Sequence, residues 1–315
     1  MRRCLYCYKP LANNEHDFHA SCSKKIFGQS IPPVLPYSEA DLEHLAKELI
    51  QSKTAVTGVQ AKLSLHITGN NQEESGKRFT IVGLWGGYIL KPPTALNQQL
   101  PAVEDVTMHL ASLAKIKTAH HSLIRLASGN LAYVTKRIDR LKKGKLAMED
   151  MCQLTDRLTE DKYQGSYEQI GKAIQKYSAT SGLDVVNFFE LVLFSFLTGN
   201  ADMHLKNFSL LEQPGLGMVL SPAYDLVNTA LVNPADDEEM ALHLNGKKKK
   251  IKKQDFVTAM NTLKIDNKQQ QNIFTKMEKA RPTWLEQIDN SFLTDDYKTQ
   301  YKQIVTERFE IINML

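Results

Sequence analysis

The feature that most constrains the fold of this chain is an apolar run that leads directly into a polar loop. The run, Val185–Leu197, is apolar nearly all round and is interrupted by Asn187, Glu190 and Ser195. It is too short to span a bilayer, which takes about 20 apolar residues. A helix without a polar face is buried in a core, so the run predicts a helix around which a helical lobe packs.

The hydrophobic pattern changes at about residue 140. Before that point, short alternating runs separated by turn residues such as Gly129-Asn130 predict strands, and residues 104–114 predict a helix. The predicted strands span residues 63–67, 78–82, 88–91, 123–126 and 131–135. From residue 149 onward helical patterns dominate, with short strands at 205–211 and 218–220.

Three prolines in residues 31–36 predict an extended linker that separates the first 30 residues from the rest. Ser38 and Asp41 match a capping box, which predicts a helix to about residue 50. We therefore expect three regions. They are an N-terminal Cys/His segment with its linker (1–36), a mainly β lobe (37–140) and a helical lobe (141–315).

Composition excludes some classes of protein. The net charge of +4 over 315 residues is too small to indicate a nucleic-acid-binding surface by itself. The first ten residues lack the apolar core of a secretion signal, and four cysteines in a chain of this length do not form a disulfide scaffold. We therefore expect a cytoplasmic protein with no membrane partner.

The loop after the apolar run carries the sharpest chemical signal. Asp202 is followed five residues later by Asn207, which is the spacing of a protein-kinase catalytic loop. In that chemistry a carboxylate accepts the proton of the attacking hydroxyl, and an amide oxygen helps to bind Mg²⁺. Both groups must come from one short, rigid loop, so the position at the end of a buried helix is suitable.

The order of other polar residues strengthens this interpretation. Lys91 ends an apolar strand and could contact phosphates, Glu104 lies early in the next helix and could hold that lysine, and Asp225 follows the loop as a second metal-binding carboxylate. Taken singly, Lys91 and Glu104 also fit surface charges, and Asp225 fits a turn. Their order across a β region and then a helical region favours a kinase.

These motifs together resemble the HipA family of bacterial toxin kinases, over roughly residues 50–255. The motifs that carry the resemblance are residues 57–62, 90–92, 136–140, 149–153, 202–209 and 222–225. The resemblance implies a two-lobed α+β protein-kinase-like fold, with a small, mainly β N-lobe, a helical C-lobe and ATP between the lobes. It also implies a serine/threonine protein kinase.

The resemblance assigns roles to matching residues. Asp202 would be the catalytic base, and Asn207 and Asp225 would hold Mg²⁺. The residues expected to contact ATP are Thr57, Gly58, Val59, Gln60, Lys62, Lys91, Glu104, Thr135, Lys136, Ile138, His204 and Lys206. His204 could equally orient the loop without touching a phosphate.

Two departures from the family bear on regulation. The kinase motifs begin near residue 53, which resembles the short HipT-type toxins whose N-terminal β subdomain is a separate small protein. Ala55 stands where the family often has a regulatory serine, so autophosphorylation is expected, if it occurs, on Ser52, Thr54 or Thr57.

The resemblance also implies partners. These are a HipB-like helix-turn-helix antitoxin, a HipS-like small protein or both, and, as substrate, an aminoacyl-tRNA synthetase whose phosphorylation arrests translation. DNA would be reached only through the antitoxin. Two alternatives stay open: a pseudokinase that docks an antitoxin and DNA, and a small-molecule kinase with a similar loop.

Two further clusters stand out. Cys4 and Cys7, with His19 and Cys22, have the spacing of a four-ligand zinc site, and His16 is an alternative ligand; a reduced segment without metal is the other interpretation. The fourth cysteine, Cys152, fits a small buried residue. Residues 246–253 hold six lysines, which favour a solvated turn after a strand at 240–244 over a phosphate- or RNA-facing patch.

Overall fold

The structure is a computed structural model that describes residues 2–50, 62–69, 77–82, 86–141 and 143–313. Contacts divide the chain into two compact units, which we describe separately. Unit 1 comprises Met1–Asp105, Ala119–Ile138 and Asn290–Phe292, and unit 2 comprises Val106–Thr118, Asp139–Asp289 and Leu293–Leu315. The domain limits predicted at residues 36 and 140 stay predictions.

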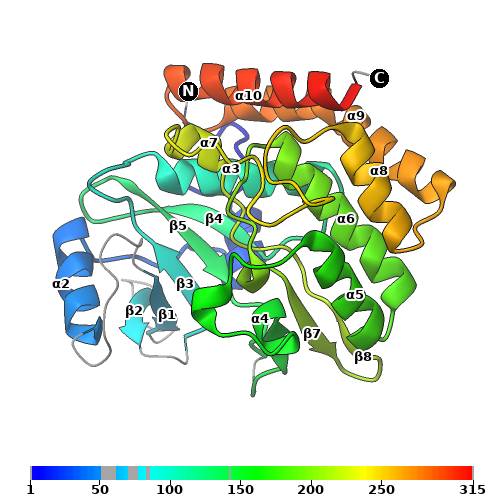
Figure 1. Cartoon of the computed structure of the whole chain (residues 1–315). Coiled ribbons are helices and arrows are strands. Elements are labelled where there is room, and N and C mark those ends of the chain that lie inside the picture. The colour runs from blue at the N-terminus through cyan, green and yellow to red at the C-terminus, as the bar shows by residue number, and fades with distance from the viewer. Residues whose placement is uncertain (1, 51–61, 70–76, 83–85, 142, 314–315) are drawn as a thin grey trace. The chain divides into compact units, whose positions relative to one another are not determined.

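Unit 1 is built on a five-stranded antiparallel sheet with the order β2-β1-β3-β5-β4 (Figure 1). The strands are β1 (Leu63–Thr68), β2 (Arg78–Val82), β3 (Tyr88–Lys91), β4 (His121–Arg125) and β5 (Leu131–Lys136). All five predicted strands are confirmed, and β4 and β5 form the predicted hairpin around Gly129-Asn130. Leu63 and Leu65 of β1 are buried and alternate with less buried residues, whereas β4 and β5 are buried along most of their length.

Helix α2 (Glu39–Ile50) begins where its capping signal predicts, whereas α3 (Leu100–Leu113) begins before the predicted start at residue 104. Helix α2 follows a reciprocal pair of hydrogen bonds, in which Asp41 N donates to Ser38 Oγ and Ser38 N donates to Asp41 Oδ2. Helix α3 contributes its residues up to Asp105 to unit 1.

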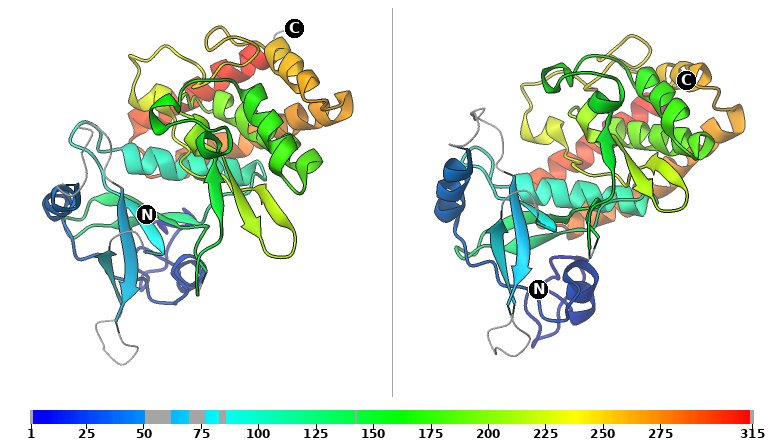
Figure 2. Two further views of the ribbon diagram at one scale, coloured as in Figure 1. Left: turned by 60° about the horizontal axis from the view of Figure 1, so that its bottom comes forward. Right: turned by 90° about the horizontal axis from the view of Figure 1, so that it is seen from below.

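The N-terminal segment is part of the sheet core, so the expectation that the linker separates it is wrong. In Figure 2 the dark-blue segment with helix α1 (Ala20–Phe27) lies beside the cyan and green strands. Buried residues of the segment share one apolar cluster with the sheet: Cys4, Leu5, Phe18, Cys22, Ile26 and Phe27, with Leu63, Leu65, Phe79, Tyr88, Leu90, Leu123 and Val134 among others. Val34 in the linker also pairs with the edge of β2, because its N–H donates to Lys77 O and its carbonyl accepts from Phe79 N. The prolines extend the chain, but apolar burial decides where it goes.

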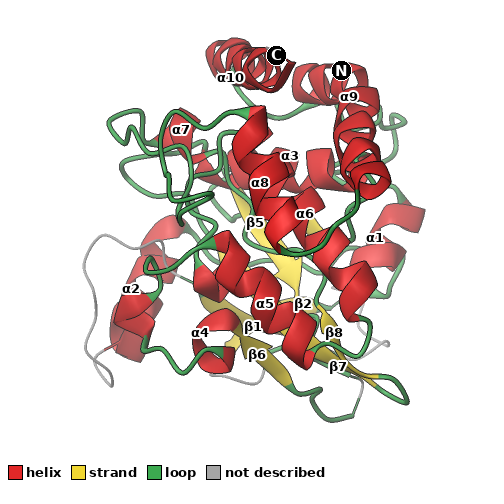
Figure 3. Cartoon of the chain, turned by 45° about the vertical axis from the view of Figure 1, so that its right-hand side comes forward, coloured by secondary structure: helices red, strands yellow, loops and turns green. Residues whose placement is uncertain are grey.

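Unit 2 is mainly helical (Figure 3). Its longer helices are α5 (Tyr167–Tyr177), α6 (Ser181–Leu197), α8 (Lys253–Thr262), α9 (Asn267–Asn290) and α10 (Asp295–Asn313), and its short ones are α4 (Met151–Leu154), α7 (Thr229–Val232) and the 3₁₀ turns η1 (Thr159–Asp161) and η2 (Leu205–Asn207). Helix α6 is the predicted apolar run, and its Phe194 packs edge-on against Trp284 with ring centroids 5.3 Å apart. A three-stranded antiparallel sheet, β6 (Met148–Asp150), β7 (Ser209–Gln213) and β8 (Gly217–Leu220), completes the unit.

Two local predictions need correction. The strand predicted at 205–211 begins as the turn η2 and becomes a strand only at Ser209. The described residues 240–244 form no strand, and His243 and Leu244 make isolated bridges instead.

The lysine run after this segment is a turn that acidic side chains cover. Three of its lysines pair with acids: Lys247 with Asp255, Lys248 with Glu238 and Lys249 with Asp237. The run forms the predicted turn, and the paired side chains of Lys247 and Lys249 are each 48% exposed to solvent. Separately, no helix in the described part of the chain is long and apolar enough to cross a membrane.

Candidate active site

Unit 1 contains a buried ion pair between Lys91, which is predicted to bind phosphate, and Glu104, which is predicted to hold Lys91 in place. Lys91 ends β3, between β1 and β5, and its Nζ lies 2.5 Å from Oε1 of Glu104 on α3. The two side chains are only 5% and 1% exposed. The Tyr133 ring centroid lies 5.5 Å from Nζ, and Tyr133 faces Lys91 across the strand pair.

This arrangement holds an ammonium group in a fixed position. The sheet fixes the main chain of Lys91, the carboxylate of Glu104 fixes its head group, and the aromatic face covers one side. A lysine held in this way can contact phosphate oxygens without a large loss of side-chain entropy. Tyr133 was not predicted from the sequence; pairing the strands around Gly129-Asn130 with β3 would have identified it.

The residues predicted to contact adenine lie at the end of β5 and directly after it, in the stretch of unit 1 that ends at Ile138. Thr135 Oγ1 donates to the carbonyl of His120, and Lys136 N donates to the same oxygen. The N–H of Lys136 is therefore already used within the sheet. In this stretch, carbonyl groups or Ile138 would therefore have to make the contact to adenine.

Most of the predicted phosphate loop lies outside the described residues. This applies to Thr57, Gly58, Val59 and Gln60, and also to the predicted phosphorylation sites Ser52 and Thr54. Lys62, at the end of that loop, is described and exposed, directly before β1. The roles of these residues stay predictions.

In unit 2, the predicted catalytic loop is held rigidly at the end of α6. Gly199 adopts a left-handed φ of 67°, and a Cβ there would lie 2.9 Å from Asn228 Oδ1 and from a methyl of Ile304. Glycine is therefore required at this position. The next residues are bonded to their surroundings, because Ala201 N donates to Thr229 Oγ1 over 2.7 Å.

Asp202 presents its carboxylate at the surface of this loop. Its side chain is 48% exposed, and Oδ1 accepts a hydrogen bond from the Tyr163 hydroxyl over 2.6 Å. Asn207 is buried, and its Nδ2 donates to the main-chain carbonyl of Asp202 over 2.9 Å. That bond orients the amide, so its Oδ1 remains an acceptor of the kind that Mg²⁺ prefers.

Asp225 lies on a strained turn tied to the same loop. Its φ is 59°, which is uncommon for a residue with a Cβ and marks a position of functional interest. The neighbouring Tyr224 hydroxyl donates to the carbonyl of Lys206 over 3.0 Å, so the 222–225 motif and the loop are linked. In turn, Lys206 Nζ pairs with Asp150 over 2.6 Å, which links the loop to the start of α4.

His204 and Tyr163 form an aromatic pair beside Asp202, with ring centroids 4.9 Å apart. Burial lowers the pKa of His204, while the negative charge of Asp202 opposes that shift. Burial and the hydrogen bond to Asp202 raise the pKa of Tyr163, so its hydroxyl keeps its proton and can donate. No sequence motif marks Tyr163, because it lies in an irregular stretch between η1 and α5, far from Asp202 in sequence.

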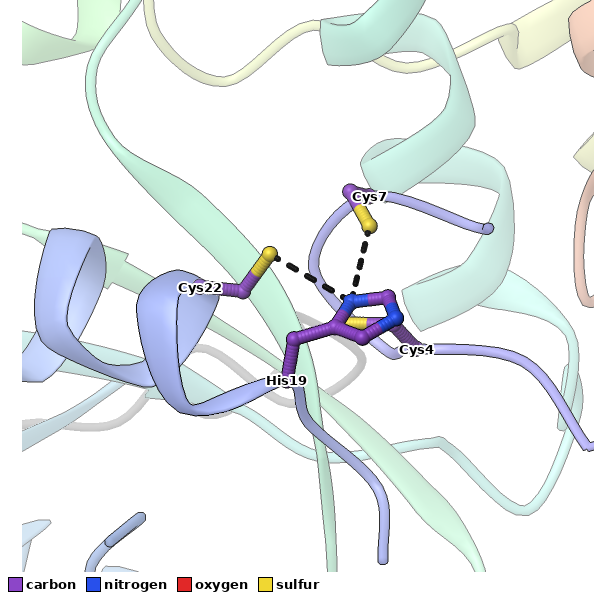
Figure 4. A group of neighbouring side chains, drawn as sticks. All are labelled: Cys4, Cys7, His19 and Cys22. Atoms are coloured by element: carbon purple, nitrogen blue, oxygen red, sulfur yellow. Dashed lines mark hydrogen bonds between the residues drawn. The ribbon is translucent and has the colours of Figure 1, made fainter. Parts of the chain in front are cut away.

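The predicted zinc ligands of unit 1 are brought together. We refer to Cys4, Cys7, His19 and Cys22 as the N-terminal thiol cluster (Figure 4). The alternative ligand His16 is not part of the cluster, since its Nδ1 contacts Arg2 instead. Cys152 is buried, as predicted.

Comparison with known proteins identifies the family. Residues 54–284, more than half of the chain, match the model of the HipA-like C-terminal domain. The chain belongs to this family. Two solved structures have a similar fold: HipA of Shewanella oneidensis, determined in a complex with HipB and operator DNA, with a TM-score of 0.70 and 21% identity, and the kinase CtkA of Helicobacter pylori, with a TM-score of 0.53 and 18% identity. The match covers 85% of this chain and 70% of HipA, and 71% of this chain and 87% of CtkA. The predicted two-lobed α+β fold, with its small β lobe and helical lobe, is therefore confirmed.

Curated relatives of this HipA-family chain include proteins named as putative kinases. "Putative kinase Y4dM" of Sinorhizobium fredii is 32% identical over 187 residues, which is 56% of this chain and 45% of Y4dM. A "Putative kinase" of Haemophilus influenzae is 28% identical over 250 residues, which is 73% of this chain and 69% of the relative. The chain thus spans less than half the length of Y4dM.

Proposed function

We propose that this HipA-family chain is an ATP-dependent serine/threonine protein kinase with Asp202 as its catalytic base. The observation that carries the proposal is the loop in unit 2. There a half-exposed Asp202 carboxylate is held by Tyr163, and the Asn207 amide is bonded to the main chain of the same aspartate. This is the pairing of base and metal ligand that phosphoryl transfer requires.

The proposed chemistry moves one proton and one phosphoryl group. The substrate hydroxyl donates its proton to Asp202, its oxygen bonds to the γ-phosphorus, and the bond from that phosphorus to the leaving ADP oxygen breaks. Tyr163 occupies Oδ1 and leaves Oδ2 to receive the proton. Bound Mg²⁺ would neutralise charge on the phosphates, and the orientation of Asn207 together with the carboxylate of Asp225 fits its preference for oxygen ligands.

The remaining predicted contacts form part of the proposal. Lys91, held by Glu104, would bind the α- and β-phosphates, and residues 57–62 would form the phosphate loop. His204 would contact phosphate as a neutral imidazole or orient the loop. The end of β5, Thr135–Ile138, would contact adenine.

We further propose that the chain acts as the toxin of a toxin–antitoxin pair. The Shewanella HipA structure contains HipB and operator DNA, which supports a helix-turn-helix antitoxin as partner and an indirect link to DNA. The proposed substrate is an aminoacyl-tRNA synthetase, and a HipS-like small protein is a second candidate partner. Autophosphorylation would fall on Ser52, Thr54 or Thr57.

Labelled ATP tests the proposal directly. Purified protein with γ-labelled ATP and Mg²⁺ should label a lysate protein, and Asp202→Asn should reduce the rate by about 10²–10⁴-fold. Asp289→Asn, on a partly exposed aspartate of unit 2, is the matched control and should keep the wild-type rate. Intact-mass analysis of the same samples reports any phosphate added to residues 52–57. Undiminished transfer by Asp202→Asn would refute the mechanism.

A further inference from the structure

The N-terminal thiol cluster has the geometry of a tetrahedral metal site. All four ligand atoms lie within 4.8 Å of one another. His19 Nδ1 is 3.4 Å from Cys7 Sγ and 3.7 Å from Cys22 Sγ. Bond lengths of about 2.3 Å to sulfur and 2.0–2.1 Å to nitrogen place such atoms about 3.6 Å apart around tetrahedral zinc. The donors in Figure 4 therefore already stand near the corners that zinc requires.

The histidine is oriented as a ligand. Its Nε2 lies 3.0 Å from the carbonyl of Pro10, and a carbonyl oxygen can only accept, so Nε2 carries the hydrogen. The lone pair of a neutral ring is then on Nδ1, the atom that faces the two sulfurs. Metal-binding histidines commonly donate their other ring N–H to a carbonyl in this way. A single lone pair facing two thiols would be an unusual arrangement for hydrogen bonding alone.

Two separate backbone elements supply the ligands. The first is a tight turn in which Tyr8 N donates to Cys4 O over 2.9 Å, Cys4 N donates to Lys9 O over 2.9 Å, and Tyr8 has a φ of 62°. The second is the start of α1, where His19 is the N-cap and Cys22 lies in the first turn.

We propose that the N-terminal thiol cluster binds one structural Zn²⁺. Four protein ligands close the coordination shell, which distinguishes a structural site from a catalytic one that keeps an open position. Three thiolates and an imidazole favour zinc over the hard cations Mg²⁺ and Ca²⁺. Cys4 and Cys22 are buried in the sheet core, so the ion would join the turn to α1 beneath the sheet.

The site is bonded to the residues next to the candidate active site of unit 1. Between the first two ligands, the Leu5 carbonyl accepts from Leu123 N and Ser122 Oγ on β4. Directly after Cys7, the buried Tyr8 hydroxyl donates to Asp105 Oδ2 over 2.6 Å.

Asp105 also contacts His121 and directly follows Glu104, the residue that holds Lys91. Zinc would thus fix the turn that contacts α3 at Asp105. The link from the zinc site to ATP binding rests on the proposed function, which gives Lys91 and Glu104 a role in ATP binding.

Metal analysis of the full chain, purified without chelator and under reducing conditions, tests the site. We expect about one equivalent of zinc in the wild type and in the control Cys152→Ser, and little in Cys22→Ser. His19→Ala should lose zinc, and His19→Cys should keep it, because a cysteine thiolate is also a zinc ligand. If Cys22→Ser does not fold, the pair at His19, a partly exposed residue, still decides the matter.

Cobalt gives a second readout that does not depend on activity. Co²⁺ added to the zinc-depleted wild type should show the intense visible bands of tetrahedral thiolate coordination, and these bands should be absent in His19→Ala. No bound zinc and no cobalt bands in a folded, reduced wild type would overturn the proposal.

The coupling to α3 has its own test. Tyr8→Phe should keep zinc and weaken ATP binding by roughly tenfold, the order of a hydrogen bond to a charged group. Unchanged ATP affinity in Tyr8→Phe would refute the coupling and leave the zinc site intact. Bound zinc in a wild type that binds no ATP would refute the proposed function and support the zinc site, so the two failures are distinguishable.

Discussion

Removal of one member of the Lys91–Glu104 pair should be costly, and the structure sets the scale. The pair is 2.5 Å long and its side chains are 5% and 1% exposed, so it lies in the class of buried ion pairs. Glu104→Gln keeps the shape of the side chain but leaves the Lys91 ammonium buried without its carboxylate. Removing one partner of such a pair costs about 3–5 kcal/mol. That is a large part of the roughly 5–15 kcal/mol that stabilises a typical folded protein.

An exposed pair of almost the same length provides the control. Lys302 and Asp289 approach to 2.6 Å, but their side chains are 36% and 56% exposed. Solvent screening limits such pairs to about 0–1 kcal/mol, so Asp289→Asn should have a small effect on the free energy of unfolding. The difference between the two losses in free energy of unfolding separates the effect of burial from that of the distance between the charges, because both variants replace a carboxylate by its amide.

The double variant completes the experiment. Lys91→Met combined with Glu104→Gln removes both charges and should recover most of the stability lost in Glu104→Gln, although it should not bind ATP. Urea unfolding followed by circular dichroism gives the free energies, with equal m-values as the check that the same surface is exposed. The reasoning is refuted if Glu104→Gln costs no more than Asp289→Asn. It is also refuted if the cost of the double variant equals the sum of the costs of Lys91→Met and Glu104→Gln measured singly.

Two other variants probe unit 2. Burial lowers the pKa of His204 below that of the unfolded chain, so its neutral form contributes stability that is present above pH about 6.5 and is lost as the pH falls through the lower folded pKa. In urea titrations on both sides of that pH, His204→Gln should flatten the decline; an identical pH dependence would exclude His204 as its source. Asp225→Asn keeps a residue type that tolerates the left-handed φ of 59° but removes the carboxylate. It should weaken Mg²⁺-dependent ATP binding by about tenfold or more, or ~1.4 kcal/mol, while calorimetry without Mg²⁺ should show no difference from wild type.

Features that depend on neighbouring residues could be predicted from the sequence. The five strands of unit 1, the buried helix α6 and the cap at Ser38 follow from local periodicity and turn chemistry, and all are found. The candidate residues Asp202 and Asn207 were likewise predicted from their spacing, and the structure bonds them to each other. One error was also local, since residues 240–244 are mostly apolar, as in a buried strand, but make only isolated bridges.

Partners that are distant in the chain were decided by the tertiary structure. The prolines of the linker indicated a separate N-terminal segment, whereas Leu5 and Phe27 are buried in the core of the sheet. Tyr163 reaches Asp202 and Tyr8 reaches Asp105 without any motif, because a tyrosine hydroxyl bonds to whichever acceptor the packed backbone places within reach. The choice of His19 over His16 has the same origin, since both are near the cysteines in sequence and only one ring faces them. Sequence patterns specify which residues are buried or turn the chain, and packing in three dimensions specifies what each of them touches.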